Sequence, residues 1–142
     1  MQHNIEVRED ITVIELPGKK LQIDVYSNVN ITIPATAIIF FPGGSWLTAN
    51  RKPLAKRFAI PLAELGHVCI TAEYRVASEA DWPLQVQDIK SVVNWIRTNS
   101  TDLAVDKNKI VVAGKSAGGH LALLSSGVDY MDSKIQIGRA SC

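Results

Sequence analysis

One short segment combines a nucleophile with the backbone geometry needed to use it. Gly114-Lys115-Ser116-Ala117-Gly118 has the pattern G-x-S-x-G, directly after an apolar run and before a helical apolar pattern. A sharp strand-to-helix turn crowds the residues two before and two after Ser116, and glycines there leave room because they lack Cβ. Such a turn exposes the Ser116 hydroxyl and directs the helix N-terminus and the Ala117 N–H at an anion formed there. The segment therefore predicts nucleophilic attack on a carbonyl carbon.

A second segment could stabilise the charge that this attack creates. Pro42-Gly43-Gly44-Ser45-Trp46 follows the apolar pair Phe40-Phe41 and precedes a helical pattern. Consecutive glycines allow backbone N–H groups to turn into a pocket and donate to an oxyanion. An isolated Gly-Gly pair is usually an ordinary turn. This one lies two strand–helix units before the serine segment, which favours a functional role.

The elements that must position these segments alternate between strands and helices. Three short apolar runs are rich in β-branched residues, which is typical of strands covered on both faces: Ala37–Phe41, Val68–Ala72 and Ile110–Ala113. Helical patterns lie between them, over Pro53–Leu65 and from Pro83 to about Thr98. This alternation indicates βαβ units, so we predict an α/β protein with a mostly parallel sheet and helices on both faces.

Sequence signals also set the expected ends and faces of the two helices. In the first, Gly66 is a candidate C-cap, and Pro61 predicts a kink or an early end. In the second, Asp81 is a candidate N-cap and Pro83 suits the first turn. The apolar faces are expected to be Leu54, Phe58, Leu62 and Leu65 in the first helix, and Val86, Ile89, Val93 and Ile96 in the second.

The start of the chain has a different pattern. Ile11–Leu16 is typical of a short strand, and Pro17–Lys20 is a turn signal. Leu21–Tyr26 alternates, with Leu21, Ile23 and Val25 on one face and Gln22, Asp24 and Tyr26 on the other. A period of two marks a strand with one solvated face, so we predict an N-terminal antiparallel hairpin.

Taken in chain order, these landmarks resemble an α/β-hydrolase of the hormone-sensitive-lipase-like branch, which includes small carboxylesterases and carbohydrate deacetylases. The resemblance runs from about Leu21 to His120 and beyond, and Gly114–Ala122 is its most specific match. Pro42–Trp46 stands where that family has a His-Gly-Gly motif. The other matches are Leu21–Tyr26 with an early strand, Glu73–Ala77 with an Asp-Tyr-Arg segment, and Trp82-Pro83 followed by Asp88 on the next helix.

The resemblance implies a role for each residue of the site. Ser116 would be the nucleophile, and Gly43, Gly44 and Ala117 would supply the oxyanion-hole N–H groups. The reaction would be two-step hydrolysis of a carboxylic ester through an acyl-enzyme, with a His base held by an Asp or Glu. We expect Asp88 to brace the fold rather than to act in this triad.

The sequence departs from the family pattern at three positions near these residues. Pro42 replaces the usual His, which changes the hydrogen bonding of the loop but keeps both glycine donors. Lys115 precedes the serine where an acidic residue is common, and Glu73 replaces an Asp.

The gravest departure concerns the acid and base. In this fold the triad order is Ser, then Asp or Glu, then His. After Ser116 the acids are Asp129 and Asp132 and the only histidine is His120, four residues along the same predicted helix. A base must approach the serine from a separate loop, so we expect His120 to pack and the triad to be incomplete.

Three interpretations of the missing acid and base stay open. The 142 residues would be a single domain, the N-terminal half of an α/β-hydrolase domain, and inactive alone. The first interpretation is an esterase fragment, the second a catalytically inactive α/β-hydrolase-like binding module, and the third a split enzyme completed by a second chain. In each case a sheet ending beside the serine strand would expose an edge, so self-association is expected.

Composition narrows the remaining function classes. Lys+Arg of 15 against Asp+Glu of 14 gives no electrostatic case for nucleic acid or a membrane surface. Cys69 is expected to be a buried free thiol, and with Cys142 it makes no disulfide framework. There is no dinucleotide or P-loop motif and no metal-ligand spacing, so we expect no cofactor and no metal. The start has no signal pattern, and we predict a cytoplasmic protein that acts on a small-molecule ester.

Overall fold

A single mixed sheet contains every strand of the described chain. The computed structural model describes residues 4–44, 49–115, 118–119 and 135–140. A sheet of six strands has the order β1-β2-β4-β3-β5-β6. The strands are β1 (Ile5–Leu16), β2 (Lys19–Asn28), β3 (Ala35–Phe41), β4 (Val68–Ala72), β5 (Val105–Lys115) and β6 (Ile135–Ala140).

The direction of the strands confirms the predicted fold class. β4, β3, β5 and β6 pair in parallel, whereas β1 pairs with β2, and β2 with β4, in antiparallel fashion. The three predicted apolar runs form β3, β4 and the second half of β5, and most of their residues are buried, as expected for strands covered on both faces. The protein is therefore an α/β protein with a mostly parallel sheet and an N-terminal antiparallel hairpin, a partial α/β-hydrolase fold.

The N-terminal hairpin is longer and more buried than its sequence pattern predicts. β1 begins at Ile5 instead of Ile11, and the connection to β2 is the turn at Pro17 and Gly18, where Gly18 has φ 73°. The prediction of a solvated face on β2 is wrong, because Asp24 is 0% and Tyr26 is 3% exposed. The segment after β3 and the first helical segment cover that face.

One face of the sheet is covered by α2 (Leu84–Thr98). Its predicted apolar positions, Val86, Ile89, Val93 and Ile96, are all buried against the strands. The two predictions for its start are wrong: Pro83 is itself the N-cap, and no side chain caps the helix. Asp81 contributes only its backbone carbonyl, which accepts the Leu84 N–H at 2.9 Å.

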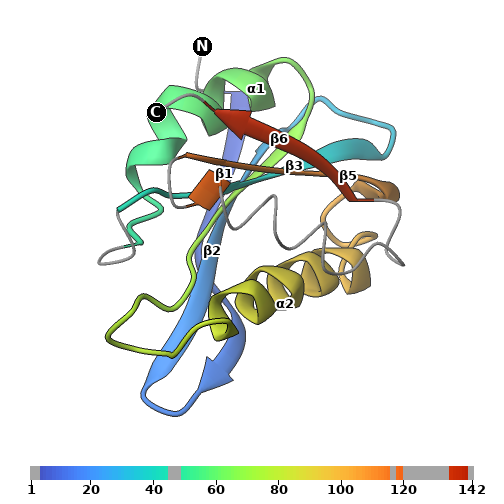
Figure 1. Cartoon of the computed structure of the whole chain (residues 1–142). Coiled ribbons are helices and arrows are strands. Elements are labelled where there is room, and N and C mark those ends of the chain that lie inside the picture. The colour runs from blue at the N-terminus through green and yellow to red at the C-terminus, as the bar shows by residue number, and fades with distance from the viewer. Residues whose placement is uncertain (1–3, 45–48, 116–117, 120–134, 141–142) are drawn as a thin grey trace.

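The opposite face is covered by η2 (Ala55–Ala59) followed directly by α1 (Ile60–Glu64), so helices cover both faces as predicted (Figure 1). Pro61 does not end this helical segment. A π-helical turn precedes it, in which the Ile60 N–H donates to the Ala55 carbonyl five residues back. Leu65 was expected on the buried face but is 76% exposed. The C-cap is Leu65 and not Gly66 as predicted; Gly66, with φ 105°, is the residue that follows it.

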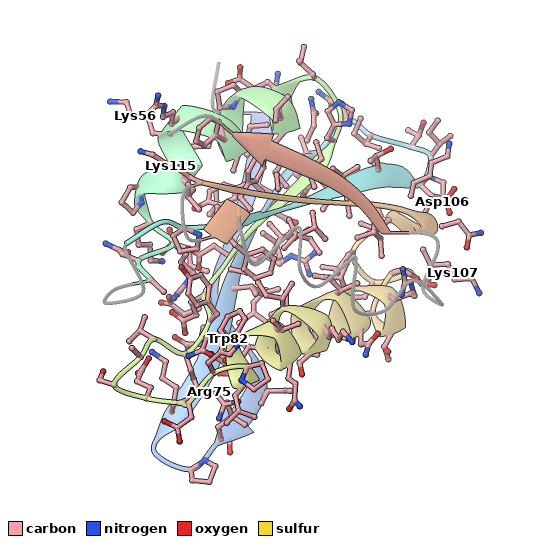
Figure 2. All side chains as sticks on the ribbon, viewed as in Figure 1. Lys56, Arg75, Trp82, Asp106, Lys107 and Lys115 are labelled. Atoms are coloured by element: carbon pink, nitrogen blue, oxygen red, sulfur yellow. The ribbon has the colours of Figure 1, made fainter. Side chains whose placement is uncertain are left out.

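No helix in the described part of the chain is long and apolar enough to cross a membrane. Figure 2 places Lys115 at one end of β5, and Asp106 and Lys107 near the other. The first of these ends is the carboxyl end of the parallel strands β3 and β5, which pair from Ala37 with Ile110 to Phe41 with Gly114. Ligands of open parallel sheets bind at this end.

Candidate active site

The carboxyl ends of β3 and β5 are held together by a backbone contact at two glycines. A Cβ on Gly114 would lie within 3.0 Å of the Gly118 backbone and the Gly119 nitrogen. A Cβ on Gly118 would lie equally close to the carbonyl groups of Phe41 and Pro42. The predicted crowding across the serine turn is thus observed, and it reaches a second strand. Only glycine fits at either position.

The Pro42-Gly43-Gly44 loop leaves β3 with its amides free. Among the described residues, no acceptor takes a hydrogen bond from the Gly43 or Gly44 N–H. Gly44 has φ 147°, a conformation that favours glycine. Two adjacent backbone donors at the end of a buried strand can bind a developing negative charge.

Tyr74 fixes the start of this loop from beneath. Its hydroxyl donates a 2.8 Å hydrogen bond to the Pro42 carbonyl, and its ring lies 6.5 Å from that of Phe41. Burial raises the pKa of Tyr74 to about 12, so the hydroxyl remains a donor at neutral pH. Pro42 stands where the resembled family has a His. The bond from Tyr74 gives the Pro42 carbonyl a hydrogen-bond partner.

The predicted site residues fall partly outside the described residues. Gly43 and Gly44 lie together at the end of β3, and Lys115 ends β5 beside them. Ser116 and Ala117 lie outside the described residues, as do His120, Asp129 and Asp132. The proposed roles of Ser116 and Ala117 therefore rest on sequence position. Both residues lie between Gly114 and Gly118, which the structure places in contact.

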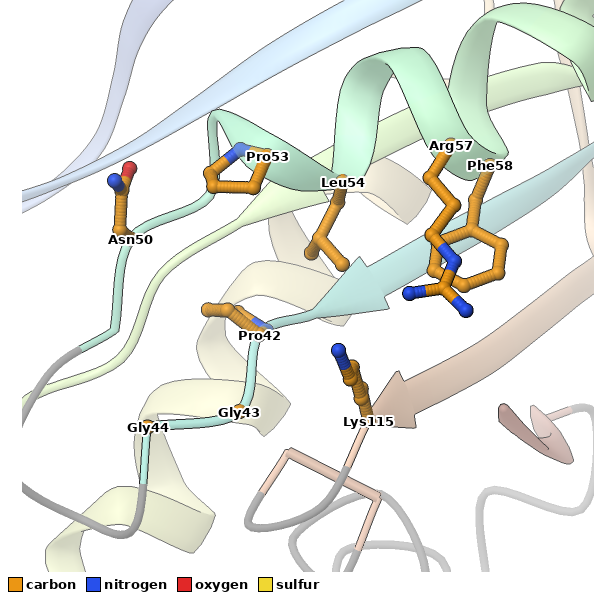
Figure 3. Close-up of a pocket in the computed structure, with 9 residues that line it drawn as sticks. All are labelled: Pro42, Gly43, Gly44, Asn50, Pro53, Leu54, Arg57, Phe58 and Lys115. Atoms are coloured by element: carbon orange, nitrogen blue, oxygen red, sulfur yellow. The ribbon is translucent and has the colours of Figure 1, made fainter. Parts of the chain in front are cut away.

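A pocket of about 440 Å³ opens beside the loop (Figure 3). Its lining comes from three places: the loop after β3, the first helical segment and the end of β5. The lining residues are Pro42, Gly43, Gly44, Asn50, Pro53, Leu54, Arg57, Phe58 and Lys115. Phe58 stacks on Phe40 with ring centroids 5.7 Å apart. The pocket is thus apolar on the helical side and offers backbone donors on the loop side.

The pocket is lined by two basic residues, Arg57 and Lys115. The sequence analysis did not predict that these two residues line one pocket. The Arg57 guanidinium lies 5.4 Å from the centre of the Phe58 ring. Arg57 and Lys115 extend toward one another across the pocket mouth (Figure 3). None of the described lining residues is acidic. Only Lys115 carried a sequence signal, because it stands where an acidic residue is common in the resembled family.

A second group of charges, also missed, anchors the chain where it returns from the loop. Arg51 is 7% exposed and forms ion pairs with Asp10, with Asp24 at 3.2 Å and with Glu73 at 2.9 Å. Lys52 adds a 2.9 Å bond to Asp24. Burial raises the pKa of Asp24, but the bonds from Lys52 and the Asp10 N–H, with the Arg51 charge, outweigh it and lower that pKa below 3.8.

A third pairing confirms the expectation that Asp88 braces the fold. The Arg75 guanidinium donates three hydrogen bonds to the Asp88 carboxylate, at 2.8 to 3.2 Å, and the Arg75 backbone N–H adds a fourth at 2.9 Å. The hydrogen bonds that Arg75 donates to Asp88 raise the pKa of Arg75 above its ordinary value. This pairing ties the segment after β4 to α2, away from the pocket.

The described histidine and cysteine residues lie outside the pocket. The described part of the chain contains no cluster of three or more His, Cys, Asp and Glu side chains that could hold a metal ion. Cys69 is a buried free thiol, as predicted, and burial raises its pKa to about 12. His67 lies between α1 and β4 and does not line the pocket.

Comparisons with known proteins converge on one family. The BD-FAE family model matches residues 23–139. Esterase LipC of Mycobacterium tuberculosis is 42% identical over 94 residues, which are 66% of this chain and 23% of LipC. The matched part includes most of the sheet described above.

Solved structures give the same result at the level of the fold. A thermophilic esterase of Thermogutta terrifontis, Est2, aligns with TM-score 0.73 and 31% identity over 83% of this chain and 42% of that one. The same esterase phosphorylated by paraoxon aligns with TM-score 0.72 and 30% identity, over 85% and 46% of the two chains. This chain therefore spans about a quarter of the curated relative and less than half of the solved esterase.

Proposed function

The chain belongs to the BD-FAE family of carboxylesterase-like α/β-hydrolases, and from that premise we propose that it carries the nucleophile and oxyanion hole of a serine carboxylic-ester hydrolase. Ser116 is the nucleophile, and the N–H groups of Gly43, Gly44 and Ala117 form the oxyanion hole. The contact of Gly118 with the carbonyls of Phe41 and Pro42 is the observation that carries the proposal. It brings the serine turn against the loop whose amides have no acceptor among the described residues.

The proposed reaction follows from these positions. A histidine base takes the Ser116 hydroxyl proton as Oγ attacks the ester carbonyl carbon, and the carbonyl electron pair moves onto oxygen. The three N–H groups stabilise that oxyanion. The intermediate collapses to an acyl-enzyme as the base gives its proton to the departing alkoxide. Water then attacks the acyl carbon by the same route and releases the acid and free Ser116.

Neither the acid nor the base of this triad is among the residues placed in the site above. His120 follows Ser116 by four positions on the same chain segment, which is the wrong direction of approach for a base. The relatives are longer than this chain, and in the α/β-hydrolase order the acid and histidine come after the nucleophile. We therefore propose that the 142 residues alone hold a weakly activated serine.

Phosphorylation by paraoxon with added imidazole tests this proposal. The relative from Thermogutta terrifontis is known in a form phosphorylated by paraoxon. Attack by Ser116 Oγ on phosphorus expels p-nitrophenolate, whose release can be followed by absorbance. Imidazole can replace a missing histidine base, since the serine and the oxyanion hole would retain part of their catalytic power.

We expect stoichiometric p-nitrophenolate release from the 142-residue protein that speeds up with imidazole and is abolished in Ser116→Ala. Ser126→Ala is the matched control and should react like the wild type. Release that needs no imidazole would support the nucleophile and overturn the missing base. A folded protein that reacts at the same rate with and without Ser116 would overturn the proposed function.

A further inference from the structure

We propose that the pocket beside Gly43 and Gly44 recognises a negatively charged group of the substrate, through Arg57 and Lys115. The inference rests on the proposed esterase function and narrows its substrate class to esters that carry a carboxylate. That carboxylate would be additional to the ester group itself.

The charge of the pocket is the first argument. Arg57 and Lys115 line it together, and the described lining residues include no acid. No carboxylate in the described ranges forms an ion pair with either side chain. Two cations facing one apolar-walled space attract an anion more strongly than either would in open water.

The second argument is the position of Lys115. It is the last residue of β5 and directly precedes Ser116, so its backbone is fixed by the pairing of Gly114 with Phe41. A cation in this place lies one residue from the proposed nucleophile. Arg57 faces it from the helical segment, with its guanidinium held near the Phe58 ring. A charged substrate group bound between them is therefore held beside the reacting ester.

The walls of the pocket specify the rest of the ligand. Pro42, Pro53, Leu54 and Phe58 supply an apolar surface, and Phe58 is itself supported by Phe40. A volume of about 440 Å³ holds a small aryl or short alkyl body. The substrate class is thus a small aryl or alkyl ester that bears a carboxylate, on either its alcohol or its acyl side.

Binding of reaction products tests the inference without any need for an activated serine. For the alcohol side, 4-hydroxybenzoate is compared with 4-hydroxybenzamide, its neutral counterpart. For the acyl side, glutarate is compared with pentanoate, which lacks the second carboxylate. Dissociation constants are measured by NMR titration of the 142-residue protein at low salt. We expect the more highly charged member of at least one pair to bind about threefold to tenfold more tightly.

Single substitutions assign the effect to the two cations. Arg57→Gln and Lys115→Gln should each reduce the preference for the charged ligand by about threefold to tenfold. Lys56→Gln is the matched control, because Lys56 is an exposed neighbour on the same helical turn and does not line the pocket (Figure 2). It should leave the preference unchanged.

The outcomes separate this inference from the proposed function. Charge-dependent binding without paraoxon reaction at Ser116 would support the anion pocket and overturn the esterase proposal. Reaction at Ser116 without any preference for the charged ligands would support the esterase proposal and overturn the anion pocket. An equal loss of preference in Lys56→Gln would overturn the inference, because it would show a diffuse effect of net charge.

Discussion

Two pairs of basic side chains, Arg51 with Lys52 and Arg57 with Lys115, have opposite surroundings. Arg51 and Lys52 contact carboxylates from β1, β2 and the segment after β4. Arg57 and Lys115 line the pocket and pair with no carboxylate of the described chain. Both pairs flank the loop that carries Gly43 and Gly44. The first pair is satisfied by the protein, and the second is left for a ligand.

The difference shows how one cation type can serve structure or recognition. A buried charge such as Arg51 needs counter-charges, because its removal from water is costly in free energy. If one partner is removed, the remaining charges stay buried without compensation. An exposed charge such as Arg57 is solvated, so it costs the fold little and contributes little to its stability. Substitutions in the two regions should therefore have very different effects.

The largest effect is expected at Arg51. Arg51→Met removes one of the two counter-charges of Asp24, which is 0% exposed, and also removes the ion-pair partner of Glu73. We expect the free energy of unfolding to fall by about 3–5 kcal/mol. Arg57→Met is the matched control and should change it by about 0.5 kcal/mol or less. Urea unfolding followed by circular dichroism measures both, and similar values for the two variants would erase the proposed distinction.

The order of the pocket region is expected to depend on backbone packing instead of ion pairs. Gly118→Ala would force a Cβ against the carbonyls of Phe41 and Pro42. We expect a loss of about 1–3 kcal/mol in the same unfolding measurement. Gly18→Asn provides the control, because no atom lies within 4 Å of a Cβ at that turn and Asn tolerates its φ of 73°. A fully stable Gly118→Ala protein would contradict the contact between the two segments.

Acid should weaken the paired region through Asp24. Its pKa is lowered in the fold, so its carboxylate stabilises the protein above the pKa of the unfolded chain. That contribution is lost as the pH falls through the lower, folded pKa. We expect the free energy of unfolding to drop below about pH 4, with a shallower drop in Asp24→Asn. Identical slopes for the two proteins would show that Asp24 is not the group responsible.

A smaller effect is expected at the support of the loop. Tyr74→Phe removes the 2.8 Å hydrogen bond to the Pro42 carbonyl and leaves that buried acceptor unsatisfied. We expect a loss of about 1 kcal/mol in the free energy of unfolding, together with a slower imidazole-dependent reaction with paraoxon. A change in stability with no change in reaction rate would mean that Tyr74 does not position the loop.

The smallest effect concerns the end of the sheet. β6 pairs with β5, the strand that leads to Ser116, and no other described strand pairs with β6. We propose weak self-association through the edge at β6. Size-exclusion chromatography over a range of concentrations should show a shift toward larger species. A constant monomer elution volume would oppose it.

The parallel strands β3, β4 and β5 could be predicted because runs of apolar residues are typical of strands buried on both faces. Val68–Ala72 is continuously apolar and forms β4 with the predicted bounds. The four predicted apolar positions of α2, Val86, Ile89, Val93 and Ile96, are all buried because they recur at helical spacing, although the buried face also includes Val92. The start of that helix was not predicted, because Asp81 has the residue type of a cap but lies too early to act as one.

The charge networks could not be predicted, because their members are distant in sequence. Asp24 follows a period-two pattern that indicates a solvated face, and only the later segment with Arg51 and Lys52 buries it. Arg57 likewise looks like an ordinary solvated helix residue until Lys115 is brought opposite it. Gly43, Gly44 and the serine turn were predictable, since their motif and its position after apolar strands carry the signal.

Localisation of the phosphoryl group tests the central proposal most directly. The 142-residue protein is treated with paraoxon and imidazole, digested with trypsin and analysed by mass spectrometry. We predict one diethylphosphoryl group, on the Ser116 hydroxyl of the peptide that begins after Lys115. A folded protein that carries the group on another residue, or carries none, would contradict the assignment of Ser116 as the nucleophile.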